Sequence, residues 1–503
     1  MSGHFPKALL SKIFANGFNL VLNLLMAILL PKSLGIALFG MFEYIMEVAT
    51  QIMTFLQLNM RNYFLDELTK TKNAGTFYWF LLILFIAFLV SLLLVLTGFS
   101  AYNLNNSYDT SNWLLAIIVS ISFVVLLISS LRSVGDAIGH TTYIEWYHTF
   151  YKIVLALCIS VFYFLKLVPE WSVFLAYLFV GLLFSFLIIS KIRKLLKEEL
   201  DISANTFFSF HKFKSIFYDT KPLLMYSLLT FIVDFIDRST IQFIGGNEQQ
   251  AYFGIANRFS VIAFMLSSSV NPLIFREFSR ASAKNDVGLI SDIISNFMII
   301  LFVFSSVIGI FLAVNASDIL KVFYGDDFTS GAFVFALLSI YPLQQTYGQL
   351  LSLLFYSTER IKSYRNQAVA STILGLILSY VFLMPHSFGG MDLSSVGLAF
   401  KRIITQFFGV TIGLIFFQKH YNFSVKYIYF NMLKAVIFLF ALSVAVNFIS
   451  SFFQFDLVVS LMVKMFVYVI FSTYVFFIYR NFFGLSRVLN WIIKEFNVYK
   501  NSR

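Results

Sequence analysis

Apolar runs of about 20 residues recur from one end of this 503-residue chain to the other, and they constrain its fold more than any other feature. That length lets a helix cross the hydrocarbon core of a bilayer with its backbone polar groups satisfied internally. Hydrophobic residues make up 59% of the chain and charged residues 12%, whereas soluble domains carry roughly 25% charged residues. We therefore expect an all-α integral membrane protein.

The runs predict about fourteen transmembrane helices. Their expected starts lie near residues 9, 39, 77, 113, 144, 171, 222, 251, 290, 329, 366, 395, 434 and 458. An even number of crossings places both termini on one side. Most of the 36 Lys and Arg residues fall in the loops of that side, so the positive-inside rule predicts cytoplasmic N- and C-termini. The net charge of +11 reflects this asymmetry and does not indicate nucleic acid binding.

Several chemistries lack a sequence signal. Cys158 is the single cysteine, so no intramolecular disulfide forms. The six histidines show no metal-ligand spacing, and the chain contains neither a phosphate-cradling glycine loop nor a nucleophile elbow. The first apolar run, residues 9–30, is too long for a signal-peptide core and is expected to remain as the first helix. We predict no metal, no cofactor and no enzymatic activity.

The chain is expected to contain two halves of similar design. Matching segments begin at Phe39-Gly40 and Phe253-Gly254, and each continues into a helix that ends at an arginine. Six spans separate these segments, so the two copies have the same orientation, as in transporters built from parallel repeats. We predict two pseudo-symmetric six-helix bundles around a central cavity, followed by a further helix pair. The boundaries are 1–190 for the first bundle, 191–221 for a basic cytoplasmic linker, 222–417 for the second bundle, and 418–503 for the helix pair with a basic tail.

Charged residues inside the predicted spans are the main candidates for function, because each costs roughly 2.5–3.5 kcal/mol on insertion scales. Lys401 follows Gly397 by four residues, as Arg258 follows Gly254, which places each cation one turn inside its helix. The basic candidates are Lys152, Arg238, Arg258, Lys401, Arg402 and Lys464, and the acidic ones are Glu43, Glu47, Asp234 and Asp237.

Structural explanations for these charges stay open. Asp234 and Arg238 lie four apart on one helix and could neutralise each other. Glu43 or Glu47 could pair with Lys401 or Arg402 across the bundle. The carboxylates, Glu43 and Glu47 before Asp234, could instead couple movement to protons or sodium, since burial raises a carboxyl pKa. Lys464, near one end of the last span, is expected to extend toward the membrane surface.

Four segments, in their order along the chain, resemble those of a known family. They are DFIDRSTIQFIGGNEQQAYFGIANRFSVIAF with the following basic REFSRASAKND, then ILKVFYGDDFTSGAFVFALLSI, and then STERIKSYRNQAVASTILGLILSYVFLMPHSFGGMDLSSVGLAF. Over residues 222–417 their order and spacing are similar to the polysaccharide exporters of the MOP flippase superfamily, specifically Wzx-type O-antigen flippases. The first half resembles the family less distinctively.

The resemblance implies a flippase that moves an undecaprenyl-diphosphate-linked oligosaccharide, an O-antigen or similar unit, across the bacterial inner membrane. It implies alternating access, an ion gradient or membrane potential as driving force, contact with membrane lipids and a possible polysaccharide polymerase as partner. It also implies a cationic cavity, to which Arg258, Lys401, Arg402 and Arg238 correspond, with Lys152 as an inner contact. The planar fork of arginine suits the oxygens of a diphosphate.

Three other functions compete with this one. A lipid II-type flippase is a close sibling. A multidrug or cation exporter of the same superfamily would favour an acidic, aromatic cavity, whereas basic residues outnumber acidic ones in the predicted spans. A polymerase or glycosyltransferase of polysaccharide assembly would need a substantial external loop, and the outer loops near 99–112 and 315–328 are short.

Overall fold

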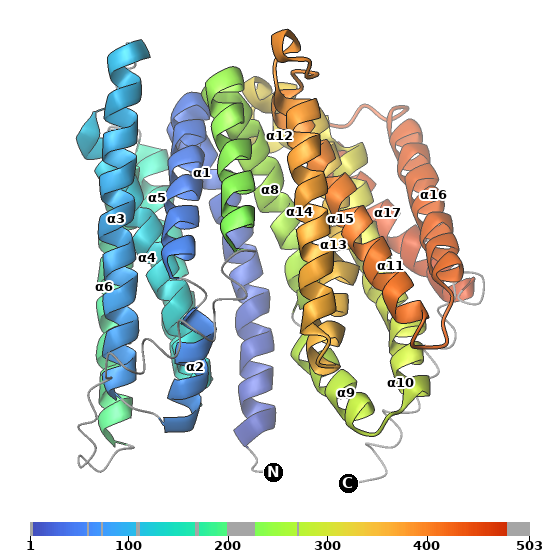
Figure 1. Ribbon diagram of the computed structural model, residues 1–503. Helices are drawn as coiled ribbons and strands as arrows, with labels where there is room; N and C mark the ends of the chain where they lie inside the picture. The colour runs from blue at the N-terminus through green and yellow to red at the C-terminus, as the bar shows by residue number, and fades with distance from the viewer. Residues whose placement is uncertain are drawn as a thin grey trace. The chain divides into compact units, whose positions relative to one another are not determined.

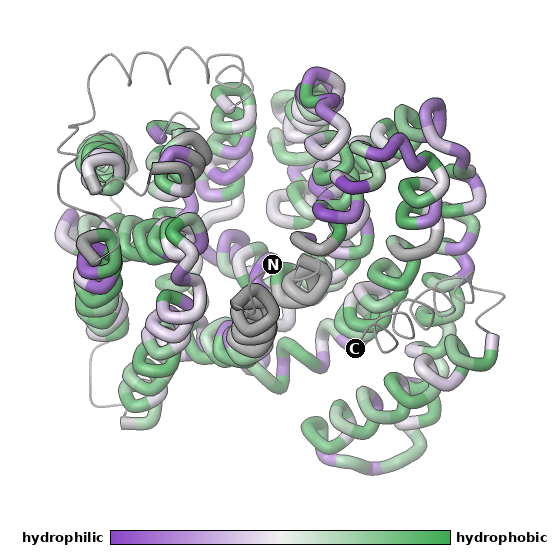
Figure 2. The backbone as a smooth tube through the Cα atoms, turned by 90° about the horizontal axis from the view of Figure 1, so that it is seen from below, coloured by the Kyte–Doolittle hydropathy of each residue, from purple (hydrophilic) through white to green (hydrophobic). Residues whose placement is uncertain are grey.

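The computed structural model describes residues 4–57, 60–71, 74–106, 111–165, 171–198, 227–268 and 271–479. Every regular element in these ranges is helical (Figure 1). Hydrophobic residues predominate along the helices, and hydrophilic residues concentrate at helix ends, in turns and on short stretches of a few helices (Figure 2). The all-α prediction is confirmed for this part of the chain.

Ten helical segments among the described residues are long and apolar enough to cross a membrane, which makes this a multi-span membrane protein. They are Gly17–Leu56, Gly75–Gly98, Asn112–Ala137, Thr141–Phe164, Ser172–Leu196, Val287–Val314, Ile361–Leu383, Ser394–Gln418, Val425–Ser450 and Leu457–Ile478.

The difference from the larger predicted number has local reasons. The first candidate, Gly17–Leu56, is 40 residues long, about twice the length that one crossing needs. Gly35, at φ 71°, interrupts the helix within it, at the junction of the first two predicted spans. Helix α13 (Ala332–Ser357) is long enough to cross, but its three glutamines lower its hydropathy. The seventh predicted span begins outside the described residues. The full predicted count stays a prediction.

The chain forms two compact units, Met1–Ala251 and Tyr252–Arg503, called here the N-terminal and C-terminal units. The division falls inside α8 (Gly246–Ser268), so the helical residues 227–240 belong to the N-terminal unit. The predicted linker, 191–221, lies earlier in the chain. The last helix before it, α6, continues to Glu198, and most of the predicted linker lies outside the described residues.

In the N-terminal unit, α1 packs against α3, α4 and α5, and α4 packs against α5 and α6. Aromatic contacts tie these helices together: the ring of Phe42 in α1 stacks on Phe174 in α6 with centroids 5.3 Å apart. The helices of this unit are α1 (His4–Leu56), α2 (Met60–Thr71), α3 (Ala74–Asn106), α4 (Asn112–Ala137), α5 (Thr141–Leu165), α6 (Ser172–Glu198), residues 227–240 and the π-helix η1 (Ile241–Gly245).

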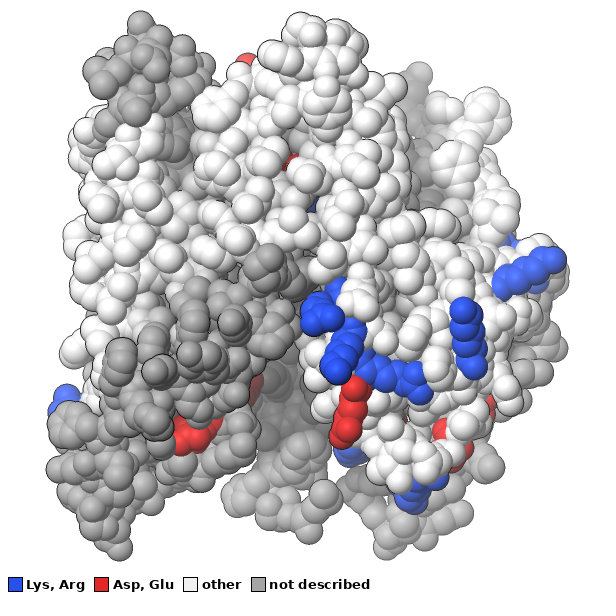
Figure 3. Space-filling view, viewed as in Figure 1, with Lys and Arg blue, Asp and Glu red and all other residues white. Residues whose placement is uncertain are grey.

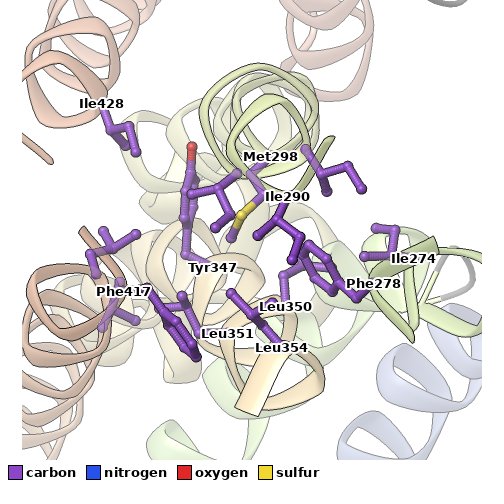
Figure 4. Packing of buried hydrophobic residues seen from close by; sticks show 14 of the residues in the cluster. Ile274, Phe278, Ile290, Met298, Tyr347, Leu350, Leu351, Leu354, Phe417 and Ile428 are labelled. Carbon is purple, nitrogen blue, oxygen red and sulfur yellow. The ribbon is translucent and has the colours of Figure 1, made fainter. Parts of the chain in front are cut away.

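In the C-terminal unit, α13 is central and packs against α9, α11 and α15. Figure 4 shows its buried leucines with Phe417 from α15 and Met298 from α11. The elements of this unit are the rest of α8, α9 (Asn271–Ala283), α10 (Val287–Asp292), the π-helix η2 (Ile293–Phe297), α11 (Met298–Val314), α12 (Ala316–Tyr324), the 3-10 helix η3 (Asp326–Gly331), α13, α14 (Ile361–Leu383), the 3-10 helix η4 (His386–Phe388), α15 (Ser394–Gln418), α16 (Val425–Ser450) and α17 (Leu457–Ile478).

The final helix pair is anchored to the C-terminal unit. Helix α16 packs on α11 and α17, and the buried ring of Tyr468 lies 5.4 Å from that of Phe311. The Nζ of Lys464 lies 2.8 Å from Oδ2 of Asp318 in α12, and the lysine side chain is 11% exposed. This ion pair joins α17 to the short helix α12.

Candidate functional site

A tight hairpin between α14 and α15 positions the two adjacent cations Lys401 and Arg402. The backbone amide of Met391 donates to the Val381 carbonyl at 2.8 Å, and that of Leu393 donates to Phe382 at 2.8 Å. Gly397 lets α15 approach α14 closely, because a Cβ there would lie 2.8 Å from the Phe382 carbonyl oxygen. Arg402 follows five residues later, about 7.5 Å further along the helix axis.

Arg402 is held by uncharged groups on α8. Its Nη1 donates to Oδ1 of Asn257 at 2.7 Å, and its Cζ lies 4.8 Å from the centre of the Phe253 ring. A guanidinium has five N–H donors. Within the described part of the chain Arg402 forms no ion pair, so the charge is oriented without being neutralised by a carboxylate. Asn257, Phe253 and Arg402 are called the Arg402 cluster.

Lys401 packs against α14, whereas Arg402 contacts α8. Its side chain is 5% exposed, and its Cε lies 3.2 Å from the position that a Cβ on Gly375 of α14 would occupy. The absence of a side chain at Gly375 therefore makes room for the lysine between α14 and α15. Arg258 lies on α8, next to Asn257, and its side chain is half-buried. The sequence-predicted cations Arg258, Lys401 and Arg402 thus all belong to the C-terminal unit.

The fourth predicted cation, Arg238, belongs to the N-terminal unit and lies in a second polar group. Its Nη1 donates to Oε1 of Gln250 at 3.1 Å, and Nε2 of Gln250 donates back to the Arg238 carbonyl at 2.7 Å. Its Nη2 lies 3.8 Å from Oε2 of Glu47 in α1, whose Oε1 accepts from Gln51 at 3.1 Å. We call Glu47, Gln51, Arg238 and Gln250 the Arg238 cluster.

A close approach of backbones fixes the helices that carry the Arg238 cluster. A Cβ on Gly40 of α1 would lie 1.8 Å from the carbonyl oxygen of Asn247, so only glycine fits there without a shift of one helix. One turn after Gly40, the hydroxyl of Tyr44 lies 3.3 Å from the hydroxyl of Ser239. These contacts hold α1 against the segment that runs from Arg238 through η1 into α8.

The four predicted carboxylates differ in their surroundings. Oε2 of Glu47 lies 3.8 Å from Nη2 of Arg238, and the Glu47 side chain is 37% exposed. Asp237 is buried, Glu43 is half-buried and Asp234 is exposed. Asp234 lies one turn before Arg238, and its pairing with Arg238 stays open as an alternative beside the 3.8 Å contact with Glu47. All four carboxylates belong to the N-terminal unit, whereas Lys401 and Arg402 belong to the C-terminal unit.

Lys152 lies apart from the Arg238 cluster within the N-terminal unit. Its Nζ donates to Oδ1 of Asn23 in α1 at 2.6 Å. One face of α5 also carries Glu145, whose Oε1 and Oε2 accept from Nη2 of Arg132 in α4 at 2.8 and 2.7 Å. Glu145 is 3% exposed. This part of the bundle is therefore a buried polar interface between α1, α4 and α5.

Sequence reasoning missed the neutral members of these groups. Asn257, Gln250, Gln51 and Asn23 each contact one of the predicted charged residues. Amides are cheaper to place in a membrane than full charges, so a search for intramembrane charge passes over them. Their signal in the sequence is position: Asn257 adjoins Arg258, and Gln250 ends the polar stretch GGNEQQ in which α8 begins.

The chain matches no protein-family model. No curated protein matches it either. Solved structures do match. The lipid II flippase MurJ, in an inward closed conformation, has a TM-score of 0.65 at 16% identity and covers 93% of this chain and 98% of its own.

Other solved transporters have a similar fold. A MATE family multidrug resistance transporter of the MOP superfamily, in an inward-facing conformation, has a TM-score of 0.59 at 13% identity, with 80% of this chain and 94% of that one covered. A MOP superfamily transporter from Pyrococcus furiosus with a binding pocket of reversed polarity has a TM-score of 0.55 at 13% identity, with 81% and 95% covered. This chain therefore has the fold of membrane transporters and flippases, and at these identities the likeness concerns the fold alone.

Proposed function

We propose that this protein is a flippase for a lipid-linked oligosaccharide. It would carry an undecaprenyl-diphosphate-linked unit of an O-antigen or similar polysaccharide across the bacterial inner membrane by alternating access. Both termini would lie in the cytoplasm, and an ion gradient or the membrane potential would drive the movement.

The observation that carries the proposal is the Arg402 cluster. An arginine inside a predicted span is expensive and usually functional. A structural arginine normally has a carboxylate partner, whereas Arg402 is oriented by an amide and a phenyl ring. Charge-assisted, bidentate hydrogen bonds from arginine match the oxygens of a phosphate group. Arg402 is therefore oriented to bind an anionic group of the substrate. We propose that this group is the diphosphate. Arg258, Lys401 and Arg238 are proposed to add positive potential, and Lys152 an inner contact.

The carboxylates are candidates for coupling substrate movement to a proton or sodium gradient. Glu47 touches Arg238 but keeps more than a third of its side chain exposed, so it is accessible to a proton or sodium ion. A cation that binds Glu47 would weaken its attraction for Arg238. We propose Glu47, with Glu43, Asp234 and Asp237 nearby in the same unit, as the coupling group.

A multidrug exporter is the second candidate, and the MATE transporters of similar fold favour it. The two functions require opposite charge. A cationic drug needs an acidic contact, so an exporter would depend on the carboxylates and tolerate the loss of Arg402. A diphosphate substrate reverses that dependence. A lipid II flippase shares the diphosphate and differs in the sugar, and the MurJ fold favours it equally on structural grounds.

The deciding experiment uses the purified protein in proteoliposomes. Flipping of a fluorescent undecaprenyl-diphosphate glycan is measured for the wild type, Arg402→Gln and the matched surface variant Arg193→Gln. We expect Arg402→Gln to lower the flipping rate at least tenfold and Arg193→Gln to leave it unchanged.

Drug export by the same variants is measured in parallel. Export of a cationic dye that survives Arg402→Gln but fails in Glu47→Gln, with no flipping by the wild type, would replace the flippase with the exporter. Lipid II and an O-antigen-type lipid are compared as substrates to separate the two flippases. An enzyme of polysaccharide assembly would lengthen or transfer the glycan, which mass spectrometry of the lipid detects.

A further inference from the structure

A second arginine in the C-terminal unit, Arg360, has uncharged contacts like those of Arg402. It lies where α14 begins, near the end of α15. Arg360 ends the turn between α13 and α14, and its backbone amide donates to the Phe355 carbonyl at 2.9 Å. Its Nη1 lies 2.6 Å from Nε2 of His420, in the turn after α15, and its Cζ lies 5.6 Å from the centre of the Phe416 ring.

These contacts indicate which ring nitrogen of His420 carries the proton. A guanidinium can only donate, so Nε2 of His420 accepts. The ring proton then lies on Nδ1, which is 2.9 Å from the Phe416 carbonyl oxygen and donates to it. His420 is therefore neutral in this arrangement, and it orients Arg360 without neutralising its charge. The adjacent Glu359 is exposed, and no ion pair joins it to Arg360 in the described part of the chain.

More cations surround Arg360. Lys362 follows it on α14, Lys419 adjoins His420, and Lys426 lies in the first turn of α16, and all three are exposed. None of these lysines forms an ion pair with another described residue. Lys and Arg side chains gather over the lower part of the C-terminal unit in Figure 3, with few acidic side chains among them. We call Arg360, Lys362, Lys419 and His420 the Arg360 patch.

The patch lies where a lipid headgroup would lie. It is formed by the ends of two candidate spans, Ile361–Leu383 and Ser394–Gln418. Large apolar side chains beside it are exposed, including Tyr356 at 47% and Ile361 at 45%, which suits an acyl chain or the interfacial region. The positive-inside rule assigns this end to the cytoplasm, where the membrane leaflet carries anionic lipid and basic pockets between spans bind phosphate headgroups.

We propose that the Arg360 patch binds the phosphate of an anionic phospholipid in the cytoplasmic leaflet. Arg360 contacts the phosphate oxygens through the N–H groups that His420 leaves unused, while Lys362 and Lys419 supply further positive charge. The site is distinct from the Arg402 cluster and does not depend on which substrate is carried. The assignment to the cytoplasmic leaflet depends on the predicted orientation of the chain in the membrane.

The test measures lipid binding, so its result is separate from transport. Purified wild type, Arg360→Gln and the control Arg193→Gln, another exposed cation at the end of a span, are titrated with phosphatidylglycerol or with phosphatidylcholine of the same acyl chains. Native mass spectrometry records the bound lipid. We expect wild type and Arg193→Gln to retain phosphatidylglycerol over phosphatidylcholine, and Arg360→Gln to lose at least fivefold of that preference. A His420→Phe variant should lose part of it, because Arg360 is then less well oriented.

Two controls separate the alternatives. Circular dichroism and the melting temperature establish that the variants are folded, and Arg360→Lys keeps the charge while it removes the fork. Equal lipid preference in Arg360→Gln and Arg193→Gln would overturn the site. Displacement of the lipid by millimolar inorganic phosphate would make it a site for soluble anions and overturn the lipid assignment. Binding of an acidic protein in place of lipid, found by crosslinking at Lys362 or Lys419, would overturn it as well.

Discussion

Arg402 and Asn257, far apart in the sequence, are joined by a 2.7 Å hydrogen bond from Nη1 to Oδ1. The amide fixes one edge of the guanidinium, and the Phe253 ring covers one face. An aspartate in place of Asn257 would bond equally well but would neutralise the charge. The choice of asparagine keeps Arg402 both oriented and cationic, which is the combination that an anion-binding site requires.

The first prediction concerns this amide. Asn257→Leu should lower the rate of flipping about tenfold with a normal protein level in the membrane, because Arg402 loses its orientation but keeps its charge. The expected loss corresponds to about 1.4 kcal/mol, at the upper end of the range for an ordinary hydrogen bond and just below that for one to a charged group. Rates in proteoliposomes measure it.

Asn257→Asp separates orientation from charge. It preserves the hydrogen bond and adds a carboxylate, so we expect flipping to fall at least as far as in Asn257→Leu. Full activity in Asn257→Asp would show that the free charge of Arg402 is not needed, and the anion-binding role would then be withdrawn.

The sequence predicts the helical membrane fold well because hydrophobicity and length suffice for it. It also places Lys401, Arg402 and Arg258 in one half of the chain. It does not identify contacts between helices. Arg238 approaches Glu47 on α1, a contact that the sequence does not specify, because rotamers and helix packing decide which side chains meet. Amide partners such as Gln250 carry no periodic or charge signal, so only the structure reveals them.

The second prediction separates the members of the Arg238 cluster. The Arg238 side chain is 3% exposed and bonded to Gln250, whereas the Glu47 side chain is 37% exposed and 3.8 Å away. Arg238→Gln should therefore destabilise the protein by about 1.5–3 kcal/mol, and Glu47→Gln by less than about 1 kcal/mol. Thermal unfolding in detergent measures both. Equal losses in the two variants would mean that the ion pair, and not the hydrogen bonds of Arg238, dominates.

The third prediction concerns the ion pair of Arg132 and the buried Glu145. Arg132→Gln leaves the Glu145 carboxylate, 3% exposed, without its partner and should cost about 3–5 kcal/mol of stability. Replacing both residues with methionine should cost less than Arg132→Gln alone, because no buried charge is then left unpaired. The control is Arg280→Gln, which removes an exposed partner 4.0 Å from Glu277 and should cost under about 1 kcal/mol. If the double variant is the least stable of the set, the pair contributes more than the avoidance of an unpaired charge.

The last prediction tests the close approach that holds α1 against α8. A Cβ at Gly40 would lie 1.8 Å from the Asn247 carbonyl oxygen, and since that atom belongs to the backbone, one helix must move. Gly40→Ala should therefore lower the melting temperature by about 1–3 °C, because overpacking of a tight contact costs about 1–3 kcal/mol and a chain of this size unfolds with a large entropy change. The matched control is Gly98→Ala in α3, where a Cβ meets nothing within 4 Å. There alanine should keep or raise the melting temperature, because it favours the helix by roughly 0.5–1 kcal/mol. If Gly40→Ala melts like Gly98→Ala, α1 and the start of α8 are not in the contact described, and the Arg238 cluster loses the packing that positions it.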